Sequence, residues 1–273
     1  MTTLIGIIAG LVALIGGFLL EGGHISGLWE ATAAIIVFGG TIAAVVISFP
    51  QHRLRSIPTA LRMAFKQREN QMPQLIDDIV AMSTQARRNG VLVLEETAQK
   101  HKNTFLRDGV LLVVDGNDPE LVKEMLDIDM DAVEYKHDGY AKIFEAAGGY
   151  APTMGIIGTV MGLIHVLSNL NDPGMLGPSI AVAFTATLYG VASANVLYLP
   201  IATKIRTRSA QQIREMELIQ CGILAVQAGE NPQIIRKKLS AYMQGEDTIE
   251  PLSRVKNRSN IKVERGMKYE TQK

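Results

Sequence analysis

The chain has 273 residues, of which 47% are hydrophobic, and it carries 27 basic and 27 acidic side chains. Its single cysteine, Cys221, excludes an intrachain disulfide and a metal site of the CxxC type. The basic residues are segregated, because none occurs before Arg53 and none lies between Lys142 and Lys204. Cytoplasmic segments of membrane proteins collect Lys and Arg, so this sorting argues against a soluble protein and for a membrane protein.

Two apolar runs open the chain. The first, Thr2–Leu20, is close to the ~20 residues that a helix needs to cross hydrocarbon. It has no basic segment before it and no clear cleavage site after it, so it is interpreted as a retained span rather than a signal peptide. The second run is Leu28–Phe49, with Trp29 at the position of an interfacial aromatic and Pro50 at its end. Residues 1–50 are therefore predicted to hold transmembrane helices 1 and 2.

Residues 51–147 are predicted to form a helical cytoplasmic domain. An apolar stripe of helical period ends in Arg-Arg-Asn-Gly at 87–90, which is a helix stop signal. Further helices are predicted over Leu92–Lys102 and Thr104–Val114. The sequence Asn-Asp-Pro at 117–119 supplies an N-cap followed by proline at the first helical position. A long helix is predicted to start there and to run on into the third span.

The third and fourth spans, Gly148–Leu167 and Ile180–Leu199, lie within residues 148–201. Each has one helical face of small residues with a single hydroxyl, Thr159 in the third span and Thr187 in the fourth. Such a face is either a close-packing surface or the wall of a narrow, wet passage. The linker between the two spans, 168–179, is rich in Gly and Pro and is predicted to be a turn cluster.

Residues 202–273 are predicted to be cytoplasmic helices followed by a basic tail. A helix is expected from Lys204, an interruption at 229–232, a short helix over 232–243 and a disordered tail over 250–273. The loops before the second and fourth spans lack Lys and Arg, so they are predicted to face outside. The expected fold is an all-α membrane protein with four transmembrane helices, both termini in the cytoplasm, and a helical cytoplasmic insert between spans 2 and 3.

The sequence contains no enzyme motif, no metal-ligand spacing and no basic-aromatic pattern of a nucleic-acid surface, so no enzymatic activity is expected. A proton or cation pathway needs an ionisable group within the membrane, yet no span has a carboxylate near its middle. If ions pass, the carboxylate must come from a partner, and Thr159 and Thr187 would supply oxygen atoms beside it. The alternative is that each hydroxyl bonds back to the carbonyl four residues earlier.

Two prolines and one charged turn are further candidates. Pro152 and Pro200 mark points where a helix could bend, although proline kinks are frequent in membrane helices for purely structural reasons. Opposite charges flank the turn at Gly90. They form either an exposed tip that docks a complementary surface or two helix ends matched to their macrodipoles. These charged residues are Arg87, Arg88, Glu95 and Glu96.

Taken together, five segments resemble the A subunit of the flagellar stator, the MotA/PomA family. Three resemble its third and fourth membrane helices, one the end of its second helix and one its charged cytoplasmic loop. In that order the segments are YAPTMGIIGTVMGLI at 150–164, AVAFTATLYG at 181–190, YLPIATK at 198–204, FGGTIAAVVISFP at 38–50 and RRNGVLVLEE at 87–96.

The resemblance implies a job and a set of partners in the bacterial inner membrane. In this family a homopentamer of A subunits surrounds the single membrane helices of two B subunits, which supply the essential membrane Asp and a peptidoglycan-binding domain. Flow of H⁺ or Na⁺ at that Asp turns the A ring, whose cytoplasmic insert pushes the rotor protein FliG. No resident cofactor and no nucleic acid are implied.

The resemblance also implies roles for single residues. Pro152 and Pro200 match the prolines that couple ion flow to motion, and the charged residues around Gly90 match those that face the rotor. Thr159 and Thr187 match threonines associated with sodium-driven members. Thr159 favours sodium because many proton-driven members have Ala there, but sodium-driven members often have a Thr pair where this chain has Ala186 and Thr187, which leaves the ion open.

Three other functions stay open at this point. The first is a proton-driven energiser of the TolQ/ExbB type, which usually has three spans and an external N-terminus. The span at 2–20 and the insert between spans 2 and 3 argue against it. A membrane scaffold without ion flux is the second, and a membrane enzyme without a recognisable motif is the third.

Overall fold

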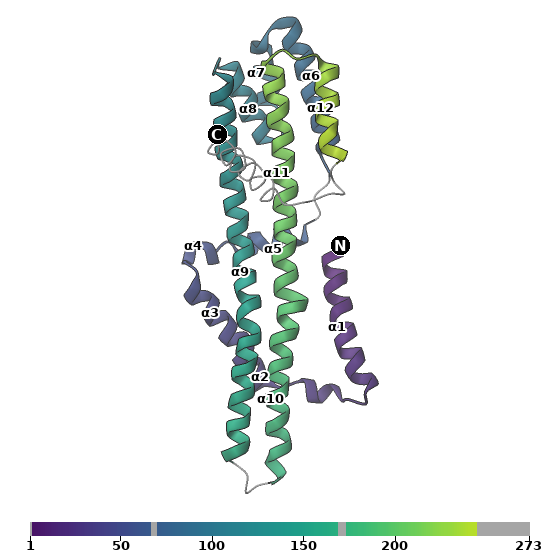
Figure 1. Ribbon diagram of the computed structural model, residues 1–273, viewed down its shortest axis with the longest axis vertical. Coiled ribbons are helices and arrows are strands. Elements are labelled where there is room, and N and C mark those ends of the chain that lie inside the picture. The colour runs from purple at the N-terminus through teal and green to yellow at the C-terminus, as the bar shows by residue number, and fades with distance from the viewer. Residues whose placement is uncertain (1, 67–69, 169–172, 245–273) are drawn as a thin grey trace, which may run out of the picture. The chain divides into compact units, whose positions relative to one another are not determined.

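The computed structural model describes residues 2–66, 70–168 and 173–244 and is helical, without a strand among those residues (Figure 1). Its elements in chain order are α1 (Thr2–Leu20), η1 (Ile25–Leu28), α2 (Ala31–Ala34), η2 (Ile35–Gly39), α3 (Gly40–Ser48), α4 (Gln51–Leu54), α5 (Ile57–Phe65), α6 (Met72–Asn89), η3 (Val91–Val93), α7 (Leu94–Gln99), α8 (Thr104–Val114), α9 (Pro119–Ser168), α10 (Pro173–Ser193), η4 (Ala194–Tyr198), α11 (Leu199–Gln227) and α12 (Pro232–Gln244).

Four helical stretches in the described part of the chain are long and apolar enough to cross a membrane. They are Thr3–Leu20, Ile25–Ser48, part of Pro119–Ser168 and part of Leu176–Gln227. The predicted all-α class with four candidate membrane spans is therefore confirmed among the described residues. The division into residues 1–50, 51–147, 148–201 and 202–273, and the side on which each terminus lies, stay predictions.

Local signals place several helix ends where the sequence predicts them. Helix α6 ends at Gly90, whose φ of +84° lies in the left-handed region that favours glycine. Helix α9 begins at Pro119, and the Asp118 carboxylate accepts a hydrogen bond from the Glu120 N–H at 2.9 Å. Helix α9 then runs without a break for 50 residues, which confirms the predicted continuity into the third span.

The predicted linker 168–179 is too long, because α10 already begins at Pro173. Proline suits the first helical position, since its φ is pre-set and its missing N–H would have no partner there. Pro178 also lies inside this helix. The predicted basic tail, 250–273, and the linker residues 169–172 lie outside the described residues.

The fourth span also continues past the point where the sequence suggests a break. Residues Ala194–Tyr198 form a π-helical turn in which the Leu199 N–H bonds to the carbonyl of Ala194, five residues earlier. A wider turn of this kind leaves room for the ring of Pro200, which would otherwise crowd the preceding turn of an α-helix. Helix α11 therefore continues to Gln227.

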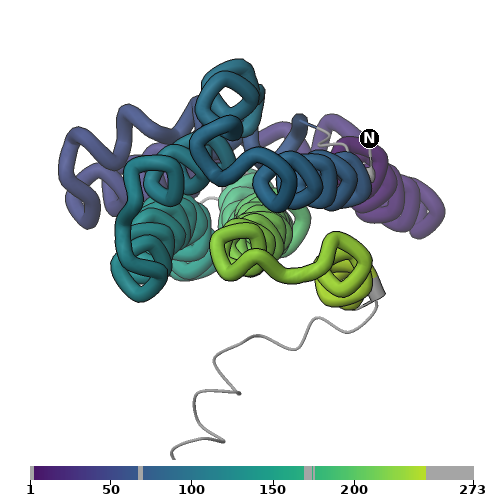
Figure 2. The backbone as a smooth tube through the Cα atoms, turned by 90° about the horizontal axis from the view of Figure 1, so that it is seen from above, coloured from purple at the N-terminus to yellow at the C-terminus, as the bar shows by residue number. Residues whose placement is uncertain are grey.

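The chain forms two compact units. The first comprises the described residues of 1–69 and 125–215, and the second those of 70–124 and 216–273. In the second unit α6 and α12 lie side by side, as the view in Figure 2 also shows. Gly222 of α11 allows close packing there, because a Cβ atom on it would lie 2.8 Å from Ile79.

The first unit has a core of small and aromatic side chains where α5 packs against α9 and α11. Ala60 and Ala64 of α5 are buried, and the short side chains let this helix approach the other two closely. The buried residues contributed by α9 and α11 are Tyr140, Ala141, Phe144, Ile201, Ala202 and Ile205. Helices α4 and α5 are not among the helices predicted from the sequence, although α5 places Ile57, Ala60, Leu61 and Ala64 at helical spacing on its packed face.

Candidate functional site

The backbones of α9 and α10 nearly touch along the two predicted small-residue faces. A Cβ atom placed on Gly155 would lie 2.9 Å from the backbone oxygen of Ala186. One placed on Gly190 would lie 2.5 Å from the backbone oxygen of Ala151. Because a backbone atom cannot move aside like the end of a flexible side chain, these positions require glycine. Within this chain, the two faces therefore pack closely against each other.

The hydroxyls of Thr159 and Thr187 are in hydrogen-bond contact across this interface. The Thr159 Oγ1 also lies 3.1 Å from the carbonyl oxygen of Gly155, on its own helix, and 2.9 Å from that of Ala183, on α10. The predicted bond to the carbonyl four residues earlier is thus present, but it is only one of three contacts. Four neutral oxygen atoms converge at this point between α9 and α10.

The chemical capacity of this oxygen cluster follows from its composition. Hydroxyl and carbonyl oxygens can replace part of the hydration shell of a cation such as Na⁺. The described residues of 146–168 and 173–199 contain no Asp or Glu, so these segments offer neither a negative charge nor a carboxylate proton acceptor. The cluster can therefore contribute ligands to a cation pathway, but it cannot complete one alone.

The two predicted coupling prolines lie near a single helix contact. Pro152 lies inside α9 and has no N–H, so it cannot donate the helical hydrogen bond to the carbonyl of Gly148. Gly148 in turn packs against Leu199, since a Cβ atom on Gly148 would lie 2.6 Å from the Leu199 Cδ2. Leu199 ends the π-helical turn and directly precedes Pro200. The structure thus places Gly148, one turn before Pro152 in α9, against Leu199, which directly precedes Pro200.

The four charged residues around the α6–α7 turn are all exposed. Arg87 and Arg88 lie in the last turn of α6, and Glu95 and Glu96 lie in the first turn of α7. Among the described residues, no ion pair joins either arginine to either glutamate. Both arrangements that the sequence left open, a charged docking tip and helix ends matched to their dipoles, fit these positions.

Glu96 has a partner on its own helix. The ammonium group of Lys100 lies 2.5 Å from the Glu96 carboxylate, and both side chains are largely exposed. The hydrogen bond from Lys100, followed by its positive charge, lowers the pKa of Glu96 below its ordinary value. Glu96 is therefore ionised at neutral pH, although its charge is partly balanced locally.

Tyr189 is a residue of this region that the sequence analysis missed. Its hydroxyl accepts a hydrogen bond from the Glu30 N–H at 3.2 Å and donates one to the carbonyl of Leu28. Its ring stacks on Phe38 with the centroids 5.8 Å apart. Tyr189 thus ties the start of the second span to α10 between Thr187 and Gly190. A tyrosine within an apolar span is a usable signal, because its hydroxyl needs a partner.

Comparison with known proteins gives a consistent family similarity. Residues 4–90 match the family model described as the motility protein A N-terminal region, and residues 97–218 match that of the MotA/TolQ/ExbB proton channel family. The chain is 37% identical to Motility protein A of Bacillus subtilis over 91% of this chain and 92% of the relative. It is also 37% identical to Chemotaxis protein PomA of Vibrio alginolyticus, over 92% and 98% of the two chains.

A solved structure gives the same similarity in three dimensions. The flagellar MotAB stator complex from Bacillus subtilis contains a chain that matches with a TM-score of 0.83 and 38% identity. The match covers 89% of this chain and 96% of that one.

Proposed function

The chain belongs to the motility protein A family, and from this premise we propose that it is the A subunit of a flagellar stator. With a B-type subunit it forms a cation channel complex that converts ion-motive force into torque on the rotor. The transported ion, H⁺ or Na⁺, is the substrate of this process, and no enzymatic step is involved.

The observation that carries the proposal is the oxygen cluster at Thr159 and Thr187, which lies between two membrane spans and contains no carboxylate. A cation pathway at this point needs an acidic group from another chain. A B-type subunit that contributes a membrane Asp would complete it. The solved MotAB stator complex supports such a partner, since it pairs a chain of this fold with a B subunit.

The proposed complex has a defined orientation in the bacterial inner membrane. The basic segments face the cytoplasm, so both termini and the helical region between spans 2 and 3 lie there. Several copies of the chain, five in the arrangement implied by the family, surround the B subunits. The exposed charges at 87–88 and 95–96 then face the rotor protein FliG.

The structure offers a physical route from ion passage to motion. Ion binding beside the B-subunit Asp changes the charge at the α9–α10 interface. The contact between Gly148 and Leu199 joins α9 to α11, which continues α10 through η4, and it lies close to Pro152 and Pro200 in sequence. On its N-terminal side, α9 extends without a break from the third span into the residues that precede it. A tilt of α9 at Pro152 would therefore be carried along that helix.

An energiser of the TolQ/ExbB type is the second candidate. The match at residues 97–218 is to a family that includes those proteins, so it does not separate the two functions. The match at 4–90 to the motility protein A N-terminal region favours the stator. A neighbouring gene that encodes a single span with an Asp and a peptidoglycan-binding domain would favour it too, whereas a TolR-like neighbour would favour the energiser.

Gene deletion tests the proposal. A strain that lacks this gene, and any second stator set, is expected to assemble flagella that do not rotate. Restoring the gene together with its B-type neighbour should restore swimming, while restoring either gene alone should not. Normal swimming of the deletion strain would refute the motor role. Swimming speed against external sodium at fixed pH then identifies the ion.

A further inference from the structure

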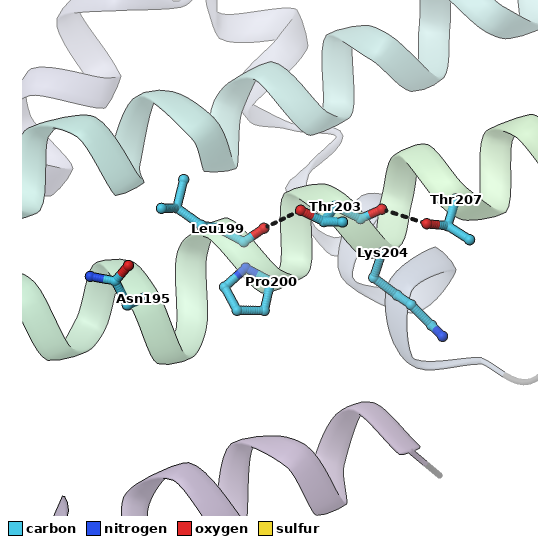
Figure 3. Close-up of a pocket in the computed structure, with 6 residues that line it drawn as sticks. All are labelled: Asn195, Leu199, Pro200, Thr203, Lys204 and Thr207. Carbon is cyan, nitrogen blue, oxygen red and sulfur yellow. Dashed lines mark hydrogen bonds between the residues drawn. The ribbon is translucent and has the colours of Figure 1, made fainter. Parts of the chain in front are cut away.

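The face of α11 opposite α9 borders a groove that the proposed ion pathway does not use. Figure 3 shows the Pro200 ring and the Lys204 side chain pointing toward α1, drawn in purple, whereas Leu199 points toward α9. A cavity of about 410 Å³ occupies this groove, and it adjoins a shallow hollow on the surface of η4 and α11. The cavity that reaches α1 is lined by Thr3, Gly6, Ile7, Gly10, Asn195, Val196, Pro200 and Lys204.

The groove is closed at one point and apolar along one wall. A Cβ atom on Gly10 would lie 3.0 Å from the Val196 side chain, so α1 and η4 touch there. Gly6, one turn toward the start of α1, has no neighbouring atom within 4 Å of its Cβ position. The Pro200 ring faces the same space. This part of the groove is open space, and its apolar lining at Gly6, Ile7 and Pro200 suits a hydrocarbon chain.

Lys204 places an unbalanced positive charge in the groove. It is half-buried, and among the residues that the structure describes its ammonium group has no ion pair or hydrogen bond. Arg206, two residues later and so about 200° around the helix, bonds instead to Glu145 of α9 at 2.9 Å. Helix α1 has no acidic residue that could pair with Lys204.

A hydroxyl group of α1 lies at the same end of the groove as Lys204. Thr3 lines the cavity together with Lys204, and its hydroxyl has no hydrogen-bond partner among the described residues. A hydroxyl donor and an ammonium group together suit a phosphate.

We propose that the groove between α1 and α11 binds one anionic phospholipid, with its phosphate between Lys204 and Thr3 and an acyl chain against Gly6. A membrane protein of this kind is surrounded by such lipids, and their charge is concentrated in the cytoplasmic leaflet. That is the leaflet in which the proposed topology puts the start of α1. The site is separate from the oxygen cluster at Thr159, so it does not depend on which ion is transported.

Lipid retention tests the charge contribution. The full complex is reconstituted in nanodiscs that contain phosphatidylglycerol and phosphatidylcholine, and the retained phospholipid is identified by native mass spectrometry. The wild type is expected to retain phosphatidylglycerol selectively. Lys204→Gln should weaken this selectivity about fivefold, as one cation near a membrane surface contributes. The matched control Lys237→Gln removes an exposed cation of α12 and should change nothing.

Filling the groove beside Gly6 tests the contribution of the acyl chain. Gly6→Leu places a side chain in the open groove and should abolish phospholipid retention. Gly16→Leu lies on the same helix, also has no atom within 4 Å, and does not line the groove, so it should retain the lipid.

Three outcomes would overturn the proposal. The first is equal retention of both lipids by the wild type. The second is binding of inorganic phosphate to the detergent-solubilised complex while no phospholipid is bound, which would indicate a site for free anions. The third is loss of subunits from the Gly6→Leu complex with unchanged lipid retention, which would mean that a second copy of the chain fills the groove. If a variant complex retains the lipid but does not rotate the flagellum, the lipid proposal stands and only the proposed stator function is in question.

Discussion

The hydroxyl of Thr159 contacts that of Thr187 across the α9–α10 interface and also lies 2.9 Å from the carbonyl oxygen of Ala183. One hydroxyl has one proton to donate, so the lone pairs of this cluster exceed its donors. A cation that reaches this point therefore meets oxygen atoms whose remaining lone pairs can coordinate it. This excess of acceptors is the physical basis for the proposal that the pair contributes to the ion pathway.

Replacing Thr159 by Ala should change ion use more than stability. Loss of one interhelical hydroxyl in a membrane protein costs only ~0.6 kcal/mol on average. If the motor uses sodium, the external sodium concentration that gives half-maximal swimming speed should rise at least about tenfold, which corresponds to ~1.4 kcal/mol of ion binding. Thr153→Ala is the control, because its exposed hydroxyl bonds only to the carbonyl of Tyr150 in its own helix. Unchanged sodium dependence in both variants would remove Thr159 from the pathway.

Gly190→Ala should separate α9 from α10. The new methyl group would lie 2.5 Å from the backbone oxygen of Ala151 and 3.2 Å from the Gly155 Cα, and neither atom can rotate away. Overpacking of this kind typically costs about 1–3 kcal/mol. The purified complex should therefore unfold at a temperature several degrees lower in a thermal melt. Gly177→Ala on the same helix meets no atom within 4 Å, so its melting temperature should not fall.

Tyr189→Phe should loosen the start of the second span. The change keeps the ring stacked on Phe38 but leaves the Glu30 N–H and the Leu28 carbonyl without their shared partner. The expected cost is about 1 kcal/mol, together with faster hydrogen exchange at residues 28–34. Tyr150→Phe is the matched control. Its hydroxyl contacts the exposed Ser48, where water can replace it.

The helix boundaries could be predicted wherever one residue determines them locally. Gly90 ends a helix because of its φ, and Pro119 begins one because of its missing N–H. Predictions failed where tertiary packing decides the outcome. The π-helical turn before Pro200 lets one helix continue through a proline that otherwise signals a break. Helix α5 is a different case, because its apolar residues follow helical spacing and the sequence analysis missed them.

The candidate site could be predicted only in part, for a related reason. Helical spacing identifies the small-residue faces that contain Thr159 and Thr187, because that spacing depends on one helix at a time. Which carbonyl of the other helix meets Thr159 depends on the relative height of two helices, and spacing within one helix carries no information about it. The Gly148–Leu199 contact and the groove at Lys204 depend on the same kind of non-local register.

Pro152→Ala should uncouple ion passage from rotation. Alanine restores an N–H that can bond to the Gly148 carbonyl, so the helix gains a hydrogen bond and loses a point of flexure. Membrane insertion and complex assembly should be unchanged, while torque on a bead attached to one flagellum should fall below detection. Pro178→Ala removes a proline inside α10, near the start of that helix, and should leave torque intact. Equal torque from both variants would reject the coupling role of Pro152.

Reversing charges around the α6–α7 turn should weaken the rotor contact without unfolding the chain. Arg88 and Glu95 are exposed, so Arg88→Glu and Glu95→Lys should each leave the melting temperature within about 1 °C, as surface changes usually do. Each should reduce torque, and a compensating reversal on the rotor should restore it, because the contact depends on complementary charge. Lys237→Glu reverses an exposed charge on α12 and serves as the control. If single reversals leave torque unchanged and only lower helix stability, the charges act through the helix dipoles alone.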